Sequence, residues 1–251
     1  MNTRVSTLLG LAMLTVGLGA EPKSGAPMQT PHTFSKTVQQ KLSIGYLLYL
    51  PEDYEKKAGE KFPLLMFLHG AGERGDKLDA VTRHGPPKLI KAGKHMPFIV
   101  VSPQCPTGSR WDNAVLLALL DELGATLRVD SKRVYLTGLS MGGYGTWSLG
   151  IEHCERFAAI APICGGGEFI KVYVASTAKG PALQSLGIWA FHGAKDTVVL
   201  PGESERMVEA LKKMGHKDTR LHMYPDASHD SWTATYDNPK LYEWFLEHRR
   251  Q

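Results

Sequence analysis

One serine stands where residue types and spacing suit nucleophilic chemistry. The run Gly138-Leu139-Ser140-Met141-Gly142 directly follows the apolar residues 134–137 and directly precedes a helical stretch. On a sharp strand-to-helix turn, glycines two residues before and after a serine avoid steric clashes and leave its hydroxyl exposed. The helix start also directs free N–H groups and the positive end of its dipole at a developing oxyanion. The pattern predicts Ser140 as a nucleophile, and the alternative is a glycine-rich turn with a structural role.

A serine hydroxyl is a poor nucleophile at neutral pH and needs a base that a carboxylate orients. Where the serine follows a strand in this way, the chain order is serine, acid, histidine, each at a later strand end. Asp196 follows the apolar run 188–191 and His229 follows residues 220–224, so we predict them as the partners of Ser140. Three nearby carboxylates are rivals for the acid and are also suited to caps or turns: Glu203, Asp226 and Asp230.

Two backbone amides are expected to stabilise the oxyanion. One belongs to the residue after the nucleophile, Met141, and the other to the loop after an earlier strand. Residues 69–75 follow the apolar run 64–68 and contain three glycines, and Ala71 is our choice of donor there. His69 and His192, which also follow apolar runs, are expected to organise their loops.

The elements that position these residues alternate along the chain. Short apolar runs and amphipathic stretches succeed one another from residue 44, which is typical of an α/β fold with a mostly parallel sheet and helices on both faces. The expected strands are 44–50, 64–68, 98–102, 134–137, 158–161, 188–191 and 220–224, and the expected helices are 113–127, 141–151, 203–214 and 239–248. Neither an internal repeat nor a linker is visible, so one domain is the simplest account.

Composition excludes several other classes of protein. The 251 residues are 43% hydrophobic and 22% charged, which is typical of a globular protein. The net charge is +4 and the basic residues are scattered, so no nucleic-acid partner is expected. No P-loop, G-x-G-x-x-G or H-E-x-x-H motif is present, so neither a cofactor nor a metal is expected. Cys105, Cys154 and Cys164 permit at most one disulfide, match no metal-ligand spacing and are expected to be buried.

The amino end has the layout of a secretory signal peptide. Arg4 precedes an apolar stretch at 8–18, and Gly19-Ala20 precede a polar segment rich in Pro, Ser and Gly. Eleven apolar residues are too few to span a bilayer, and the alternative is a buried N-terminal helix. We therefore expect a signal peptide at 1–20, a flexible segment at 21–35 and one catalytic domain at 36–251. The mature protein would then be secreted or periplasmic, with no membrane partner, as a monomer or weak homo-oligomer.

Five motifs together resemble the α/β-hydrolase superfamily. They are Leu68-His-Gly-Ala-Gly-Glu-Arg-Gly75, Ser102-Pro-Gln-Cys-Pro106, Thr137-Gly-Leu-Ser-Met-Gly-Gly-Tyr-Gly-Thr-Trp147, Phe191-His-Gly-Ala-Lys-Asp196 and His229-Asp-Ser-Trp232. They resemble most the secreted esterases related to polyhydroxybutyrate depolymerases, feruloyl esterases and the prolyl oligopeptidase-like "predicted peptidase" group. The resemblance implies an α/β-hydrolase fold, a Ser140-His229-Asp196 triad, amide donors at Ala71 and Met141, and mainly carboxylic ester hydrolysis.

Substrate preference is less strongly indicated. About 25 residues, 163–187, separate two of the expected strands, which is little material for a hydrophobic lid, and an open cleft favours polar or polymer-attached esters. Trp111 and Trp232 could stack on a sugar or an aromatic acid or pack in the core, and Gln104 could hydrogen-bond a polar group. The prediction is a serine carboxylesterase acting through an acyl-enzyme on short-acyl, aryl, feruloyl or acetyl esters. The alternatives are a serine peptidase, a polyester depolymerase, or a binding module that has lost part of the triad.

Overall fold

The computed structural model describes residues 31–250. They fall into two units, one that ends at Gln40 and one that begins at Lys41. Residues 31–40 are exposed and contain neither helix nor strand. The predicted signal peptide at 1–20 and most of the predicted flexible segment at 21–35 lie outside the described residues. No helix within 31–250 combines the length and the apolar character that a bilayer crossing requires.

The unit from Lys41 onward is built on a seven-stranded sheet in the order β1-β3-β2-β4-β5-β6-β7. The strands are β1 (Tyr46–Tyr49), β2 (Phe62–Leu68), β3 (Ile99–Pro103), β4 (Val129–Leu139), β5 (Ala159–Ile163), β6 (Gly187–Gly193) and β7 (Thr219–Tyr224). Only β1 is antiparallel to its neighbour, and all the other pairs are parallel. The seven strands lie where the sequence predicts them, and β4 starts earlier than expected.

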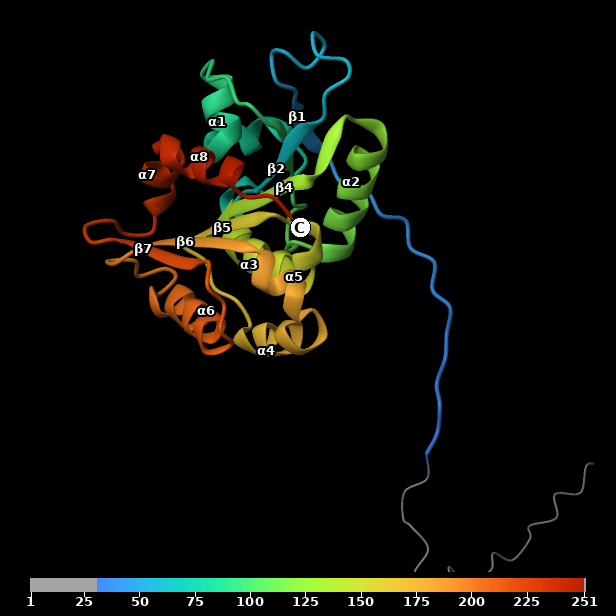
Figure 1. Cartoon of the computed structure of the whole chain (residues 1–251), viewed down its shortest axis with the longest axis vertical. Helices are drawn as coiled ribbons and strands as arrows, with labels where there is room; N and C mark the ends of the chain where they lie inside the picture. The colour runs from blue at the N-terminus through green and yellow to red at the C-terminus, as the bar shows by residue number, and fades with distance from the viewer. Residues whose placement is uncertain (1–30, 251) are drawn as a thin grey trace, which may run out of the picture. The chain divides into compact units, whose positions relative to one another are not determined.

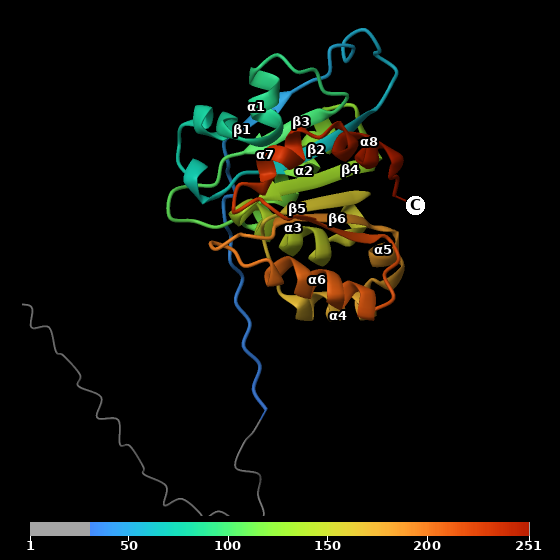
Figure 2. The ribbon, with the colours of Figure 1, turned by 90° about the vertical axis from the view of Figure 1, so that its left-hand side faces the viewer.

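Two helical layers cover the sheet (Figure 1). One face carries α2 (Asn113–Thr126), α3 (Met141–Glu152), α4 (Phe169–Ala178), α5 (Gly180–Ser185) and α6 (Gly202–Lys213), and the other carries α1 (Gly85–Lys91), α7 (Ser231–Asp237) and α8 (Pro239–Glu247). Figure 2 shows the two layers on either side of the strands. In β2, Leu64 and Met66 face the first layer while Leu65 and Phe67 face the second, because successive side chains of a strand point to opposite faces. Both faces are therefore apolar, as the sequence indicates.

Helix α2 begins at a well-defined N-cap. The Asp112 carboxylate accepts hydrogen bonds from the amides of Ala114 (2.8 Å) and Val115 (3.4 Å), which have no partner within the helix. We expect Asp112→Ala to lower the free energy of unfolding by about 1 kcal/mol, measured by urea denaturation. Glu122→Ala, on the exposed surface of the same helix, is the control and should change it by less than about 0.5 kcal/mol. Equal effects of the two substitutions would contradict the cap's contribution.

Four short helices, α1, α4, α5 and α7, are not among the sequence predictions. Helix α1 starts at Gly85-Pro86-Pro87, a composition that favours a loop, although proline is tolerated in the first helical turn. In α4 the large apolar side chains Phe169 and Ile170 are exposed, so its sequence pattern does not mark its buried face. The segment between β5 and β6, expected to be too short for a lid, thus folds into two helices.

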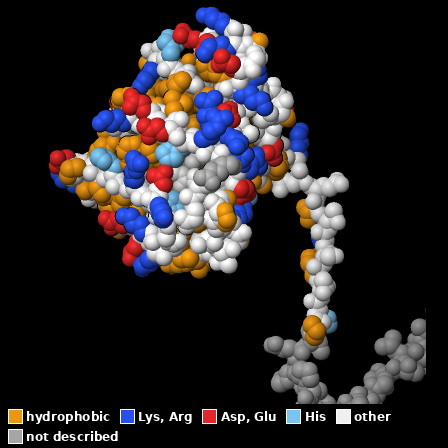
Figure 3. Space-filling model, in the orientation of Figure 1, with side chains coloured by type: hydrophobic (Ala, Val, Ile, Leu, Met, Phe, Trp, Pro, Cys, Tyr) orange, Lys and Arg blue, Asp and Glu red, His pale blue; other side chains and the backbone are white. Residues whose placement is uncertain are grey.

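The surface mixes both signs of charge. Lys and Arg side chains lie among Asp and Glu over the face seen in Figure 3. Several described ion pairs join exposed residues one helical turn apart, such as Lys57 with Asp53 (2.8 Å) and Lys213 with Glu209 (3.1 Å).

Candidate active site

Ser140 lies on the turn that joins β4 to α3. Its backbone has φ 53° and ψ −116°, a combination that is disfavoured for any residue with a Cβ atom. Its amide donates to the carbonyl of Ile163 at the end of β5 (2.9 Å), which fixes the turn against the sheet. The side chain is partly exposed, so the hydroxyl is accessible at the carboxyl edge of the strands.

The glycines around Ser140 are required by close backbone contacts. A Cβ atom on Gly142 would lie 1.9 Å from the carbonyl oxygen of Leu68, and one on Gly138 would lie 2.4 Å from the oxygen of Gly142. A Cβ on Gly165 would lie 2.5 Å from the carbonyl carbon of Gly143. The turn therefore packs directly against the ends of β2 and β5, and no side chain fits between them.

His229 lies between Ser140 and Asp196. Its Nε2 is 3.0 Å from Ser140 Oγ, and its Nδ1 is 2.8 Å from Asp196 Oδ2. The other carboxylate oxygen, Oδ1, accepts hydrogen bonds from the amides of Val198 (2.9 Å) and Val199 (3.0 Å). The structure thus brings together the three residues that the sequence predicts as a triad, from loops after β4, β6 and β7.

The Asp196 carboxylate is held in its charged form. Its side chain is buried, and burial alone would raise its pKa. The hydrogen bond from His229 and those from the Val198 and Val199 amides outweigh burial, so the pKa of Asp196 lies below its ordinary value. At neutral pH a negative charge therefore faces Nδ1 of His229, which orients the ring with Nε2 toward the serine.

The rival carboxylates have other roles. Asp226 is exposed and pairs with Lys195 (2.7 Å), and Glu203 pairs with Arg206 (2.5 Å) on α6. Asp230 is the residue before the first turn of α7. None of the three contacts His229 in the way that Asp196 does.

The two amides predicted as oxyanion donors both belong to the first residue of a helix. Met141 is the first residue of α3 and Ala71 the first of a short 3-10 helix, Ala71–Glu73, so neither amide has a partner within its own helix. The loop that contains Ala71 lies close to the serine turn: a Cβ atom on Gly70 would be 2.8 Å from the Leu139 side chain. The structure thus places the loop of Ala71 against the turn of Ser140, and the donor role of the two amides stays a prediction.

His69 organises the loop after β2, as expected. It is completely buried; its Nε2 accepts from the amide of Cys105 (3.0 Å), so its Nδ1 donates to the carbonyl of Gly70 (2.6 Å). Burial lowers the pKa of His69, which favours this neutral form. The indole of Trp111 packs on the imidazole and donates to the His69 carbonyl (3.2 Å).

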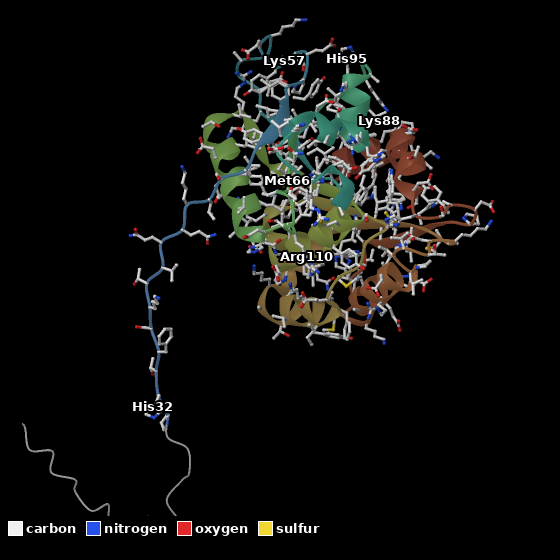
Figure 4. All side chains as sticks on the ribbon, turned by 180° about the vertical axis from the view of Figure 1, so that it is seen from behind. His32, Lys57, Met66, Lys88, His95 and Arg110 are labelled. Atoms are coloured by element: carbon white, nitrogen blue, oxygen red, sulfur yellow. The ribbon has the colours of Figure 1, made fainter. Side chains whose placement is uncertain are left out.

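A cavity of about 580 Å³ opens beside Ser140. Aromatic and apolar side chains form part of its wall, and charged groups lie among them, including Arg110, labelled in Figure 4. The side chains that line it include Trp111, Tyr144, Trp147, Met207, Glu168 and Lys171. Of the three residues predicted to contact substrate, only Trp111 lies in this wall. Glu168 and Lys171 come from the start of α4, so their place was not predictable without that helix.

Gln104 and Trp232 lie elsewhere. Gln104 is 4% exposed, and its Nε2 donates to the carbonyls of Glu73 (2.9 Å) and Lys77 (3.0 Å). Its amide therefore supports the loop after β2 instead of facing the cavity, which corrects the sequence expectation for this side chain. Trp232 packs edge to face on His229, with ring centroids 5.2 Å apart, but it is outside the 580 Å³ cavity.

The three cysteines are buried and free, so the disulfide that the sequence left open is not formed. Within residues 31–250, no group of three His, Cys, Asp or Glu side chains is arranged to hold a metal ion.

A mostly parallel sheet, a strained serine between strand and helix, and a histidine and aspartate from later strand ends together define the α/β-hydrolase superfamily. The chain belongs to the Dienelactone hydrolase family, whose model matches residues 28–241.

Two curated relatives are similar in sequence. One is the bifunctional acetylxylan esterase/xylanase XynS20E of Neocallimastix patriciarum, 30% identical over 193 residues, or 72% of this chain. The other is the probable feruloyl esterase C of Aspergillus niger, 27% identical over 169 residues, or 64% of this chain. The matches span 26% and 60% of the lengths of these two relatives.

Solved structures show the same fold. A thermostable esterase is 34% identical, with a TM-score of 0.67 over 82% of this chain and 60% of its own. The acylaminoacyl peptidase of Pyrococcus horikoshii is 17% identical, with a TM-score of 0.57 over 84% of this chain and 39% of its own. At that identity the second likeness concerns the fold alone.

Proposed function

We propose that the protein is a serine carboxylesterase with Ser140 as nucleophile, His229 as base and Asp196 as the orienting acid. The observation that carries the proposal is the continuous contact from Ser140 Oγ through His229 to a buried, ionised Asp196. An activated serine needs a base within hydrogen-bond reach and a third group that orients the base.

In the proposed reaction, Nε2 of His229 takes the Ser140 proton as Oγ attacks the ester carbonyl. The amides of Ala71 and Met141 donate to the oxyanion of the tetrahedral intermediate. His229 then gives its proton to the leaving alcohol, and an acyl-enzyme remains. Water, deprotonated by His229, attacks the acyl group and regenerates the serine.

A serine-directed phosphonate tests the proposed nucleophile. We expect a fluorophosphonate to abolish hydrolysis of p-nitrophenyl acetate and to add its mass to one peptide, with the adduct on Ser140. Labelling of another serine, or complete labelling with activity retained, would overturn the assignment.

The substrates proposed are short-acyl and hydroxycinnamoyl esters, including those attached to plant polysaccharides. Support comes from the names of the two curated relatives and from the aromatic wall that Trp111, Tyr144 and Trp147 give the cavity. The layout of residues 1–20 further supports secretion or export to the periplasm. A panel of methyl ferulate, acetylated xylan, polyhydroxybutyrate, p-nitrophenyl acetate and a peptide amide tests the class. Strong preference for the amide would favour a peptidase instead.

Substitution of Tyr144 tests the aromatic wall directly, because this side chain is 41% exposed and lines the cavity. We expect Tyr144→Ala to lower kcat/KM for methyl ferulate by about tenfold and for p-nitrophenyl acetate by less than about twofold, since only the larger acyl group would contact the ring. Tyr173→Ala on α4, outside this cavity, is the matched control and should affect neither ester. Equal losses on both esters in Tyr144→Ala would contradict an acyl-binding role.

A further inference from the structure

A second histidine lies against the carboxylate of Asp196. His192, near the end of β6, is 0% exposed, and its Nε2 is 3.3 Å from Asp196 Oδ2. This is the oxygen that His229 Nδ1 contacts at 2.8 Å. The proposed mechanism gives His192 no role, and the sequence suggested only that it shapes a loop.

The neighbours of His192 determine where its protons lie. Its Nε2 is 2.9 Å from the carbonyl oxygen of Val199 and close to the Asp196 carboxylate. Both are acceptors only, so Nε2 carries a proton and donates to Val199. The amide of the same Val199 donates to Asp196 Oδ1 (3.0 Å). His192 is therefore hydrogen-bonded to Val199, whose own amide is hydrogen-bonded to the Asp196 carboxylate.

The other ring nitrogen connects this loop to the nucleophile. Nδ1 of His192 is 2.8 Å from Ser204 Oγ on α6, and the same Oγ is 2.9 Å from the carbonyl oxygen of Gly165. Gly165 in turn packs against Gly143 on the first turn of α3, where a Cβ on Gly165 would be 2.5 Å from the Gly143 carbonyl carbon. One buried network thus joins the acid loop to the helix that begins after Ser140.

We propose that His192 is a positioning residue for Asp196, an inference that rests on the proposed function. It fixes the 196–199 loop through Val199 and brings the positive end of its Nε2–H bond to Oδ2. Both effects stabilise the carboxylate and weaken its attraction for a protonated His229. Since His229 must be neutral to act as a base, His192 keeps the base active at lower pH.

Other ionisable groups around Asp196 do not produce this effect. Burial raises the pKa of Cys164 to about 12 and also raises that of Tyr144, so both are neutral near pH 7. The remaining groups are the same in the wild type and in every variant proposed here, and they are His84, which also packs on Trp232, Glu203 with its partner Arg206, and Asp230.

The test is the pH dependence of kcat/KM, whose acid limb follows the protonation of His229 in the free enzyme. In His192→Phe the ring shape is kept and the N–H donors are lost. We expect the midpoint of the acid limb to rise by roughly half to one pH unit and kcat at neutral pH to fall by about tenfold. His192→Gln, whose amide nitrogen can replace Nε2, should return the midpoint toward that of the wild type.

His216 provides the matched control, because it is also buried between two partners. Its Nε2 is 2.8 Å from the Leu183 carbonyl and its Nδ1 is 2.6 Å from Thr219 Oγ1, away from the triad. His216→Phe should lower the melting temperature and leave the acid-limb midpoint unchanged. An unchanged or lowered midpoint in His192→Phe, or the same rise in His216→Phe, overturns the inference.

A measurement on the unmodified protein covers the case in which His192→Phe does not fold. In side-chain imidazole NMR spectra, the His192 Nε2–H signal should shift as His229 titrates, because both rings face Asp196 Oδ2. A signal that stays fixed through the titration also overturns the inference. Failure of the proposed function gives a different result. The fluorophosphonate would then not label Ser140 of the wild type, whereas failure of this inference leaves that labelling intact.

Discussion

Ser140→Ala is expected to reduce ester turnover by roughly 10⁴-fold to 10⁶-fold, to the rate supplied by binding and the amide donors alone. The loss should appear in kcat, because only the nucleophilic oxygen is removed while the cavity beside it is unchanged. The measurement is the hydrolysis of p-nitrophenyl acetate by purified protein.

The loss of turnover can be assigned to the missing nucleophile only if Ser140→Ala folds like the wild type. The melting temperature of Ser140→Ala should stay close to that of the wild type, since the side chain is only partly buried and its one hydrogen bond is to His229. Ser131→Ala, on an exposed part of β4, should retain full activity. Substantial turnover by a folded Ser140→Ala protein would refute the proposed nucleophile.

Gly142→Ala is expected to have the largest effect on folding. Its Cβ would lie 1.9 Å from the Leu68 carbonyl oxygen, and no side-chain rotation moves either atom, so α3 or the end of β2 must move. We expect a loss of more than about 3 kcal/mol in the free energy of unfolding. Any folded fraction should be at least about 100-fold less active, because the Met141 amide moves with the helix.

The control for this substitution is Gly124→Ala in α2, where a Cβ meets nothing within 4 Å. There the change should stabilise the protein by about 0.5 to 1 kcal/mol, since alanine is the better helix former. If Gly142→Ala unfolds at the same urea concentration as the wild type, the tight contact between turn and strand is not needed for stability.

The sheet was predictable because most of its strands are short apolar runs that can be recognised in the sequence. Residues 64–68 are apolar on both faces, and only a strand covered on both sides requires that. Ser140, Asp196 and His229 could be found because each lies in the turn or loop after a predicted strand, and the carboxyl ends of parallel strands meet at one edge.

The surroundings of the site were less predictable because they depend on packing between distant segments. Helix α4 exposes Phe169 and Ile170, so hydrophobic periodicity does not reveal it. Gln104 stands in a motif loop, yet only the fold shows that its amide bonds to backbone carbonyls. The contact of His192 with Asp196 likewise depends on the path of the loop between them, which no residue pattern specifies.

The segment between β5 and β6 has a consequence for protein engineering. It contributes Glu168 and Lys171 to the cavity wall, while Ser140, His229 and Asp196 come from other strand ends. This part of the cavity wall is thus encoded apart from the proposed triad, whereas Tyr144 lies on the helix that begins after Ser140. Residues 168–185 are therefore a cassette for library construction, in which one side of the wall can be varied while the proposed reacting groups stay untouched.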